Sequence, residues 1–159
     1  MRRDKTRARF GSALGARAPR GFHVYACGDA GGMRWAICRS GFPWAVNGYV
    51  RLPKGHPLFG MEYGDMPPIP VHDGITYGCD HDGWIGFATA RPTDVWPRMH
   101  PLMLNLSRTL GILFGELTYW KRRDVAREAR RLAAGLTCHR TALRNMILRE
   151  QLLAKRDVN

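Results

Sequence analysis

The sequence predicts an α+β domain in which a small, mostly antiparallel sheet is covered by C-terminal helices. Two observations carry this prediction. Short apolar runs separated by glycine-rich and proline-rich segments fill residues 22–89, a spacing typical of short strands joined by turns. After residue 118, apolar residues instead recur at helical intervals. With 159 residues, 45% of them hydrophobic, the chain is long enough to bury one core.

We divide the chain into three segments. Residues 1–20 are expected to form a flexible basic arm, because they combine many like charges with few apolar side chains. Residues 21–136 are expected to fold as the α+β domain. Residues 137–159 are expected to form a separate basic C-terminal helix.

The strands are predicted in order along the chain. Residues 22–27 and 33–38 flank a Gly-rich segment and are expected to pair as a hairpin, and residues 43–50 supply a third strand. The five prolines of residues 53–70 predict an irregular loop, since each proline fixes φ and removes a hydrogen-bond donor. Residues 69–77 and 84–89 are expected to supply the remaining strands.

Two helices are predicted at the C-terminal end. The first has one apolar stripe: Val125, Ala126, Ala129, Leu132, Ala133 and Leu136. We expect Gly135 to end this helix and a second helix to cover residues 141–155. Leu148 and Leu152 lie off the stripe of the second helix. That helix is therefore either buried on two sides or docks a partner, a second copy of the chain being the simplest one.

Charge is concentrated at both ends of a chain whose net charge is +12. Residues 1–20 hold seven Arg or Lys and one acidic residue, and residues 119–159 hold eleven and four. Such ends predict contact with nucleic acid or with an acidic host protein; solvated helix faces, or the arginine content of GC-rich coding, are the alternatives. The candidate binding residues are Arg2, Arg3, Lys5, Arg7, Arg9, Arg122, Arg123, Arg127, Arg130 and Arg131.

The sequence favours a cytoplasmic protein. No apolar run follows the N-terminal charges, as a secretory signal requires, and Arg108 and Glu116 interrupt the most apolar segment, residues 102–119. Contact with a membrane is therefore not expected. The four cysteines lack Cys-x-x-Cys spacing, which favours free thiols in a reducing compartment.

We expect no metal ion and no other cofactor. Cys79 and His81 are the weak alternative, because thiolate and imidazole are ligands of zinc. Their spacing matches no zinc knuckle, and the acidic residues beside them do not continue into a calcium loop. A polar turn between strands is the preferred interpretation.

His56, His72 and Asp94 are the weak candidates for catalytic residues. Either histidine can support a loop or a turn through its ring nitrogens, and this structural role is preferred. In the functional alternative, His72 acts as a general base or a ligand that Asp73 or Asp94 orients, with His56 nearby. No local motif places a nucleophile beside them.

Several ordered motifs resemble a family of small uncharacterised proteins found in phages and prophages. The motifs are Gly48-Tyr49-Val50, His56-Pro57-Leu58-Phe59-Gly60, Val71-His72 with Gly74 and Thr76-Tyr77, and Trp84 with Gly86-Phe87. The resemblance covers roughly residues 35–136. In that family an Asp, a His and a second Asp follow the Gly-Phe pair, and here only Asp94 is kept. The resemblance implies a phage or mobile-element setting inside a host cell, and no particular activity.

Three functions are considered. The preferred one is a non-enzymatic binding protein from a phage or prophage that uses basic surfaces to engage a host factor or nucleic acid and inhibits a host defence complex, such as a CRISPR effector. The first alternative is an enzyme, or a decayed one, with a polar pocket around His56, His72 and Asp94. The second is a virion or assembly component. A pocket that gathers both histidines and Asp94 would favour the enzyme.

Overall fold

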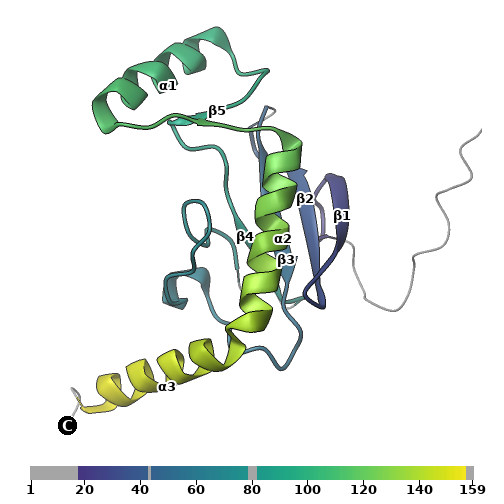
Figure 1. Ribbon diagram of the computed structural model, residues 1–159, viewed down its shortest axis with the longest axis vertical. Coiled ribbons are helices and arrows are strands. Elements are labelled where there is room, and N and C mark those ends of the chain that lie inside the picture. Colours follow the sequence, from purple (N-terminus) through teal and green to yellow (C-terminus); the bar gives the residue numbers. More distant parts are fainter. Residues whose placement is uncertain (1–17, 43, 79–81, 157–159) are drawn as a thin grey trace, which may run out of the picture.

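The computed structural model describes residues 18–42, 44–78 and 82–156, and it shows an α+β fold (Figure 1). The N-terminal arm as far as residue 17, with Arg2, Arg3, Lys5, Arg7 and Arg9, lies outside the described residues. The described end of the predicted arm packs on the domain. Ala18 is buried against the sheet, and Arg20 pairs with Asp82 at 3.2 Å.

Four strands form one antiparallel sheet in the order β1-β2-β3-β4. They are β1 (Val24–Ala30), β2 (Met33–Arg39), β3 (Val46–Arg51) and β4 (Trp84–Phe87). The predicted hairpin is β1-β2. It turns at Gly31 and Gly32, whose φ angles of 56° and 75° suit glycine in a two-residue turn. The prediction of an α+β fold with a small, mostly antiparallel sheet is therefore confirmed.

The strand predicted at residues 69–77 is wrong. This segment belongs to the long connection between β3 and β4, which also contains the 3-10 helix η1 (Tyr63–Asp65). Only Tyr77 pairs with the sheet in the described part of this connection, through a bridge to Gly86. Asp73 and Gly74 adopt φ angles of 63° and 70°, so the chain turns at the point where a strand would have to extend.

Helix α2 (Arg122–Cys138) covers one face of the sheet (Figure 1). All six residues of the predicted apolar stripe are buried there. Gly135 does not end the helix. Its φ is not positive, and its carbonyl accepts the His139 amide at 2.9 Å, so the helical ladder continues to Cys138. After His139 the chain bends into α3 (Arg140–Arg156).

Side chains alternate across the sheet and form a core on each face. On the side of α2, Trp35 and Ile37 of β2 join the main cluster with Val125 and Leu132. Ala36 and Cys38 point to the opposite face, where they pack with three residues from other segments: Ala18, Tyr49 and Trp84. The sheet is therefore covered by α2 on one face and by the chain before β1 on the other.

Helix α1 (Pro101–Phe114) was not predicted. His100 accepts the Leu102 amide at 3.3 Å, Pro101 occupies the first turn, and Gly115 ends the helix with a φ of 96°. The helix connects β5 (Asp94–Val95) and β6 (Thr118–Tyr119), which pair in parallel. In Figure 1, α1 stands beyond one end of α2, and α3 extends from the other end.

No helix in the described ranges combines the length and the apolarity needed to cross a bilayer.

Replacing Leu132 with Asp tests the packing of α2 on the sheet. Leu132 is buried in the main cluster, so the variant places an unpaired carboxylate in an apolar environment. We expect the free energy of unfolding to fall by about 3 kcal/mol or more in denaturant titrations followed by circular dichroism. Ala134→Asp, on the exposed side of the same helix, is the matched control and should cost far less. Equal effects would contradict this packing.

Candidate functional site

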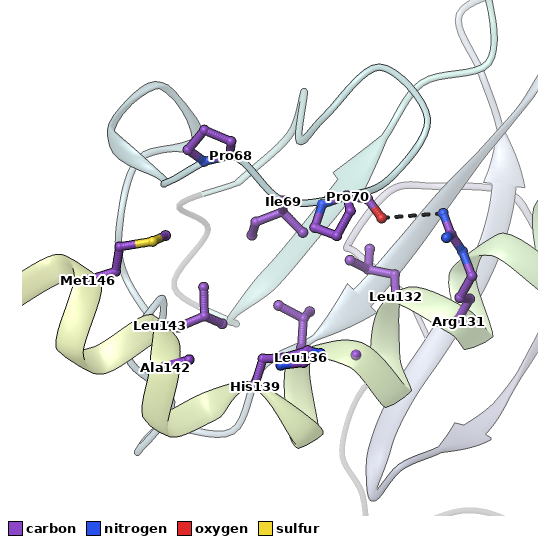
Figure 2. A pocket seen from close by; sticks show the side chains of 11 residues that line it. Pro68, Ile69, Pro70, Arg131, Leu132, Leu136, His139, Ala142, Leu143 and Met146 are labelled. Carbon is purple, nitrogen blue, oxygen red and sulfur yellow. Dashed lines mark hydrogen bonds between the residues drawn. The ribbon is translucent and has the colours of Figure 1, made fainter.

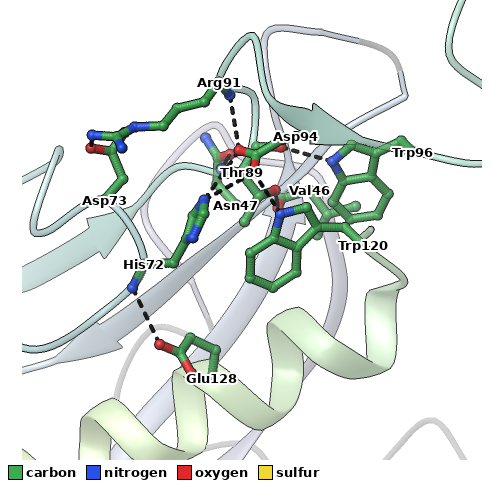
Figure 3. Close-up of polar contacts among 10 residues, drawn as sticks. All are labelled: Val46, Asn47, His72, Asp73, Thr89, Arg91, Asp94, Trp96, Trp120 and Glu128. Carbon is green, nitrogen blue, oxygen red and sulfur yellow. Dashed lines mark hydrogen bonds and ion pairs between the residues drawn. The ribbon is translucent and has the colours of Figure 1, made fainter. Parts of the chain in front are cut away.

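A buried carboxylate, Asp94, is the centre of the most extensive polar cluster in the described chain (Figure 3). Its side chain is fully buried at the start of β5. It accepts the indole N–H of Trp120 at 2.9 Å and the backbone N–H of Arg91 at 2.9 Å. The Nε2 atom of His72 lies 3.0 Å from Oδ1 and 3.2 Å from Oδ2. Asp94 therefore has three donors from three separate segments.

Two indoles enclose the cluster on one side. The ring of Trp120 meets the His72 ring edge to face at a centroid distance of 4.8 Å. Trp96 stacks on Trp120 at 6.5 Å and donates its indole N–H to the Thr89 carbonyl at 2.7 Å. The hydroxyl of Thr89 in turn donates to the carbonyl of Val46 in β3. These contacts attach the β5-β6 pair to the main sheet.

The loop that carries His72 is fastened to α2. The backbone N–H of His72 donates to Glu128 at 3.2 Å, and Glu128 pairs with Arg131 at 2.6 Å. Arg131 also donates to the Pro70 carbonyl at 3.3 Å. On the other side of His72, Asp73 forms an ion pair with Arg91. The position of the imidazole is therefore fixed from both its backbone and its ring.

His56 lies elsewhere in the fold. Its Nε2–H donates to the Leu136 carbonyl at 3.3 Å, and its Nδ1 accepts the Leu58 amide at 3.2 Å. Leu136 is eight residues beyond Glu128, roughly 12 Å along α2, so the two histidines contact different parts of that helix. The structure thus brings His72 and Asp94 together and gives His56 a separate role in holding a loop against the end of α2.

The His72–Asp94 pair has the geometry in which a carboxylate orients an imidazole. The side chain of His72 is 21% exposed, so a small group can reach its ring. The candidate nucleophiles have other contacts. Ser40 closes a turn with Phe42, and Ser107 contacts the sulfur of Met99. Burial raises the pKa of the Cys38 thiol to about 12, which keeps it protonated.

The predicted binding arginines lie at the start of α2 and along its exposed side. Arg123 and Arg127 share Asp124 at 3.9 and 3.2 Å. The guanidinium of Arg122 lies over the Tyr25 ring at 3.8 Å, and that of Arg130 over the Trp35 ring at 5.2 Å. Arg122 and Arg130 are thus held by aromatic faces, which leave their positive charge unneutralised.

The weak metal alternative, Cys79 and His81, lies outside the described residues. In the part of the chain that is described, no three His, Cys, Asp or Glu side chains are grouped as metal ligands.

An apolar groove of about 400 Å³ lies between the segment before His72, the end of α2 and the start of α3 (Figure 2). Its walls are mainly aliphatic: Ile69, Leu132, Leu136, Leu143 and Met146. Farther along α3, Leu148 and Leu152 are exposed, so the expectation that this helix is buried on two sides is wrong. Its docking to a second copy stays a prediction.

A second cavity, of about 470 Å³, was missed by the sequence reasoning. It gathers three aromatic and three cationic side chains: Tyr25, Trp44, Trp96, Arg98, Lys121 and Arg122. The signal was present in the sequence. Tryptophan precedes a basic residue within two positions at Trp96-Pro97-Arg98 and again at Trp120-Lys121-Arg122, and interleaved aromatic and basic residues are typical of nucleic-acid-binding surfaces.

Comparisons of the chain with protein families, with curated proteins and with solved structures found no match. The resemblance to phage and prophage proteins therefore stays a prediction.

Asp94→Ala tests the central carboxylate. The substitution leaves three donors without their acceptor, two of them on buried or half-buried groups. Since each buried donor left unpaired costs about 1–3 kcal/mol, the free energy of unfolding should fall by at least about 3 kcal/mol. Asp65→Ala, which removes an exposed carboxylate from η1, is the control and should change stability by less than about 0.5 kcal/mol.

The pH dependence of stability tests His56. Burial lowers the pKa of this imidazole, with the nearby Arg140 acting in the same direction, while the hydrogen bond to Leu136 opposes them. The unfolded chain takes up the proton near pH 6.5, but folded His56 takes it up only at lower pH. The free energy of unfolding should therefore decrease as the pH falls below about 6.5.

His56→Gln should flatten this decrease in denaturant titrations, because the side chain that titrates is gone. The exposed His139 provides the control, and His139→Gln should keep the decrease seen in the unmodified chain. An unchanged decrease in His56→Gln would show that other groups cause it.

Proposed function

We propose that this chain is a non-enzymatic binding protein whose basic surface engages nucleic acid. One observation carries the proposal: α2 buries its apolar stripe against the sheet and turns an excess of arginines to the solvent. Five arginines and two carboxylates lie on this helix. The two carboxylates pair with Arg123, Arg127 and Arg131, so Arg122 and Arg130 remain available to a phosphate.

The fold supports binding through a fixed surface. Because α2 is held by its buried stripe and by the contact of Glu128 with the His72 loop, its exposed side has one orientation relative to the sheet. The guanidinium groups of Arg122 and Arg130 are further positioned by the rings beneath them. Rigid cations lose less side-chain entropy on contact with phosphates than freely rotating ones.

The resemblance to phage and prophage proteins adds a setting to this proposal. In that setting the chain acts inside a host cell, and a host defence complex that contains nucleic acid would offer the phosphates that this surface fits. The N-terminal arginines would extend the same surface, since they carry the second concentration of positive charge.

The His72–Asp94 pair favours a second candidate, an enzyme that uses His72 as a general base. A buried carboxylate fixes the ring, and 21% of the His72 side chain is exposed. The three donors on Asp94 are equally explained by its structural role, because a buried carboxylate requires them. His72→Gln separates the candidates: it leaves binding of nucleic acid intact if the first proposal holds.

Substitution of two α2 arginines tests the first proposal. We expect Arg127→Gln combined with Arg130→Gln to weaken the binding of short DNA and RNA of any sequence. The slope of log affinity against log salt should decrease by about two, because each substitution removes one cation that neutralises a phosphate. The measurement is fluorescence anisotropy of labelled oligonucleotides across a salt series, with thermal melts to confirm that both proteins are folded.

The matched control removes two positive charges from α3, by Arg144→Gln and Arg149→Gln. It should leave most of the slope in place. An equal decrease would assign the binding to net charge instead of α2, and no retention of DNA or RNA at low salt would overturn the proposal.

A further inference from the structure

The cavity of about 470 Å³ lies where β1, the turn before β3, the chain after β5 and the start of α2 meet. Cavities of roughly 300–1,000 Å³ are typical of sites for small organic groups. Val46 and Pro97 complete a lining that is otherwise aromatic or cationic. Five segments of the chain therefore build one concave site at the end of the basic helix.

The aromatic side chains in this cavity differ in accessibility. Trp96 is buried, and it stacks on Trp120, so it forms a wall. Tyr25 and Trp44 are half-buried and present ring surface to the cavity. Next to Trp44 lies the ring of Phe42, which is 48% exposed at a centroid distance of 5.2 Å and a tilt of 32°. Partly exposed rings of this kind are platforms on which a flat group can stack.

The cations are placed around those rings. Arg98, Lys121 and Arg122 are all exposed, and among the described residues that line the cavity none carries a carboxylate. The guanidinium of Arg122 covers the Tyr25 ring at 3.8 Å, so its plane is itself a stacking surface. The site thus combines flat aromatic surface with an uncompensated positive charge, which fits a flat, anionic ligand.

We infer that this cavity receives an unstacked base of a single-stranded nucleic acid, with the adjoining phosphates on Arg98, Lys121 and Arg122. The inference rests on the proposed function and deepens it by naming the form of nucleic acid. The bases of a duplex are stacked and paired inside it, so they cannot enter a concave site. A duplex can contact only the cations, whereas a single strand uses both the cations and the rings.

The position of the cavity favours a strand over a free nucleotide. Arg122 is the first residue of α2, and Arg123, Arg127 and Arg130 continue from it along the exposed side of the helix. A strand with one base in the cavity can therefore place its following phosphates along α2. Phe42, beside Trp44, offers a surface for a neighbouring base in the same strand.

Trp44→Ala tests the stacking platform in the full chain. Labelled oligothymidylate and a DNA duplex of the same length are the probes, and fluorescence anisotropy at one salt concentration gives both affinities. We expect the variant to bind the single strand about tenfold more weakly and the duplex as tightly as the unmodified chain does. Trp44→Phe, which keeps an aromatic face, should recover most of the loss.

Two further measurements make the result specific. Tyr63→Ala removes another exposed aromatic ring, which lies in η1 and not in the cavity, and should leave both affinities unchanged. Thymidine monophosphate should compete with the strand only at concentrations far above those of the oligonucleotide, because it lacks the phosphates that reach α2. Competition at equal concentrations would overturn the assignment to a strand.

Failure of this inference differs from failure of the proposed function. If Trp44→Ala weakens the binding of single strand and duplex equally, or of neither, the stacking site is overturned while binding along α2 stands. If the unmodified chain retains neither probe at low salt, both proposals are overturned together.

Discussion

A carboxylate buried in a protein must receive hydrogen bonds from its surroundings, and the fold is arranged so that Asp94 receives three. Its donors come from the loop between β3 and β4, from the turn before β5 and from the segment just before α2. One side chain therefore fixes the relative position of three segments that the main sheet does not connect. The long connection carrying His72 keeps its shape through this side chain and through Glu128 of α2.

The same contacts determine what the surface presents. Trp120 is held by Asp94, and the residues directly after it, Lys121 and Arg122, begin α2 and line the aromatic cavity. Trp96, two residues after Asp94, forms the opposite wall. The buried polar cluster and the exposed basic cavity are thus two sides of one arrangement, in which order in the interior positions the cations outside.

Local patterns predicted the parts of the fold that depend on neighbouring residues. The β1-β2 hairpin follows from Gly31 and Gly32, and α2 follows from its apolar stripe. Helix α1 was missed because its apolar residues surround it without forming a stripe. The motif analysis singled out His72 and Asp94, but their link to Trp120 spans 26 residues from Asp94, and no local pattern encodes it. The cavity draws on five segments and was likewise beyond local reasoning.

Helix α1 has a consequence for how the molecule unfolds. Among its described side chains only Ser107 is buried, while Leu102, Leu106, Ile112 and Leu113 are exposed. It is attached through the short β5-β6 pair and contributes little to either core. Its hydrogen bonds can therefore open without disrupting the sheet, so its amides exchange with solvent on a separate and faster schedule than those of α2. The chain thus contains two cooperative units of unequal local stability.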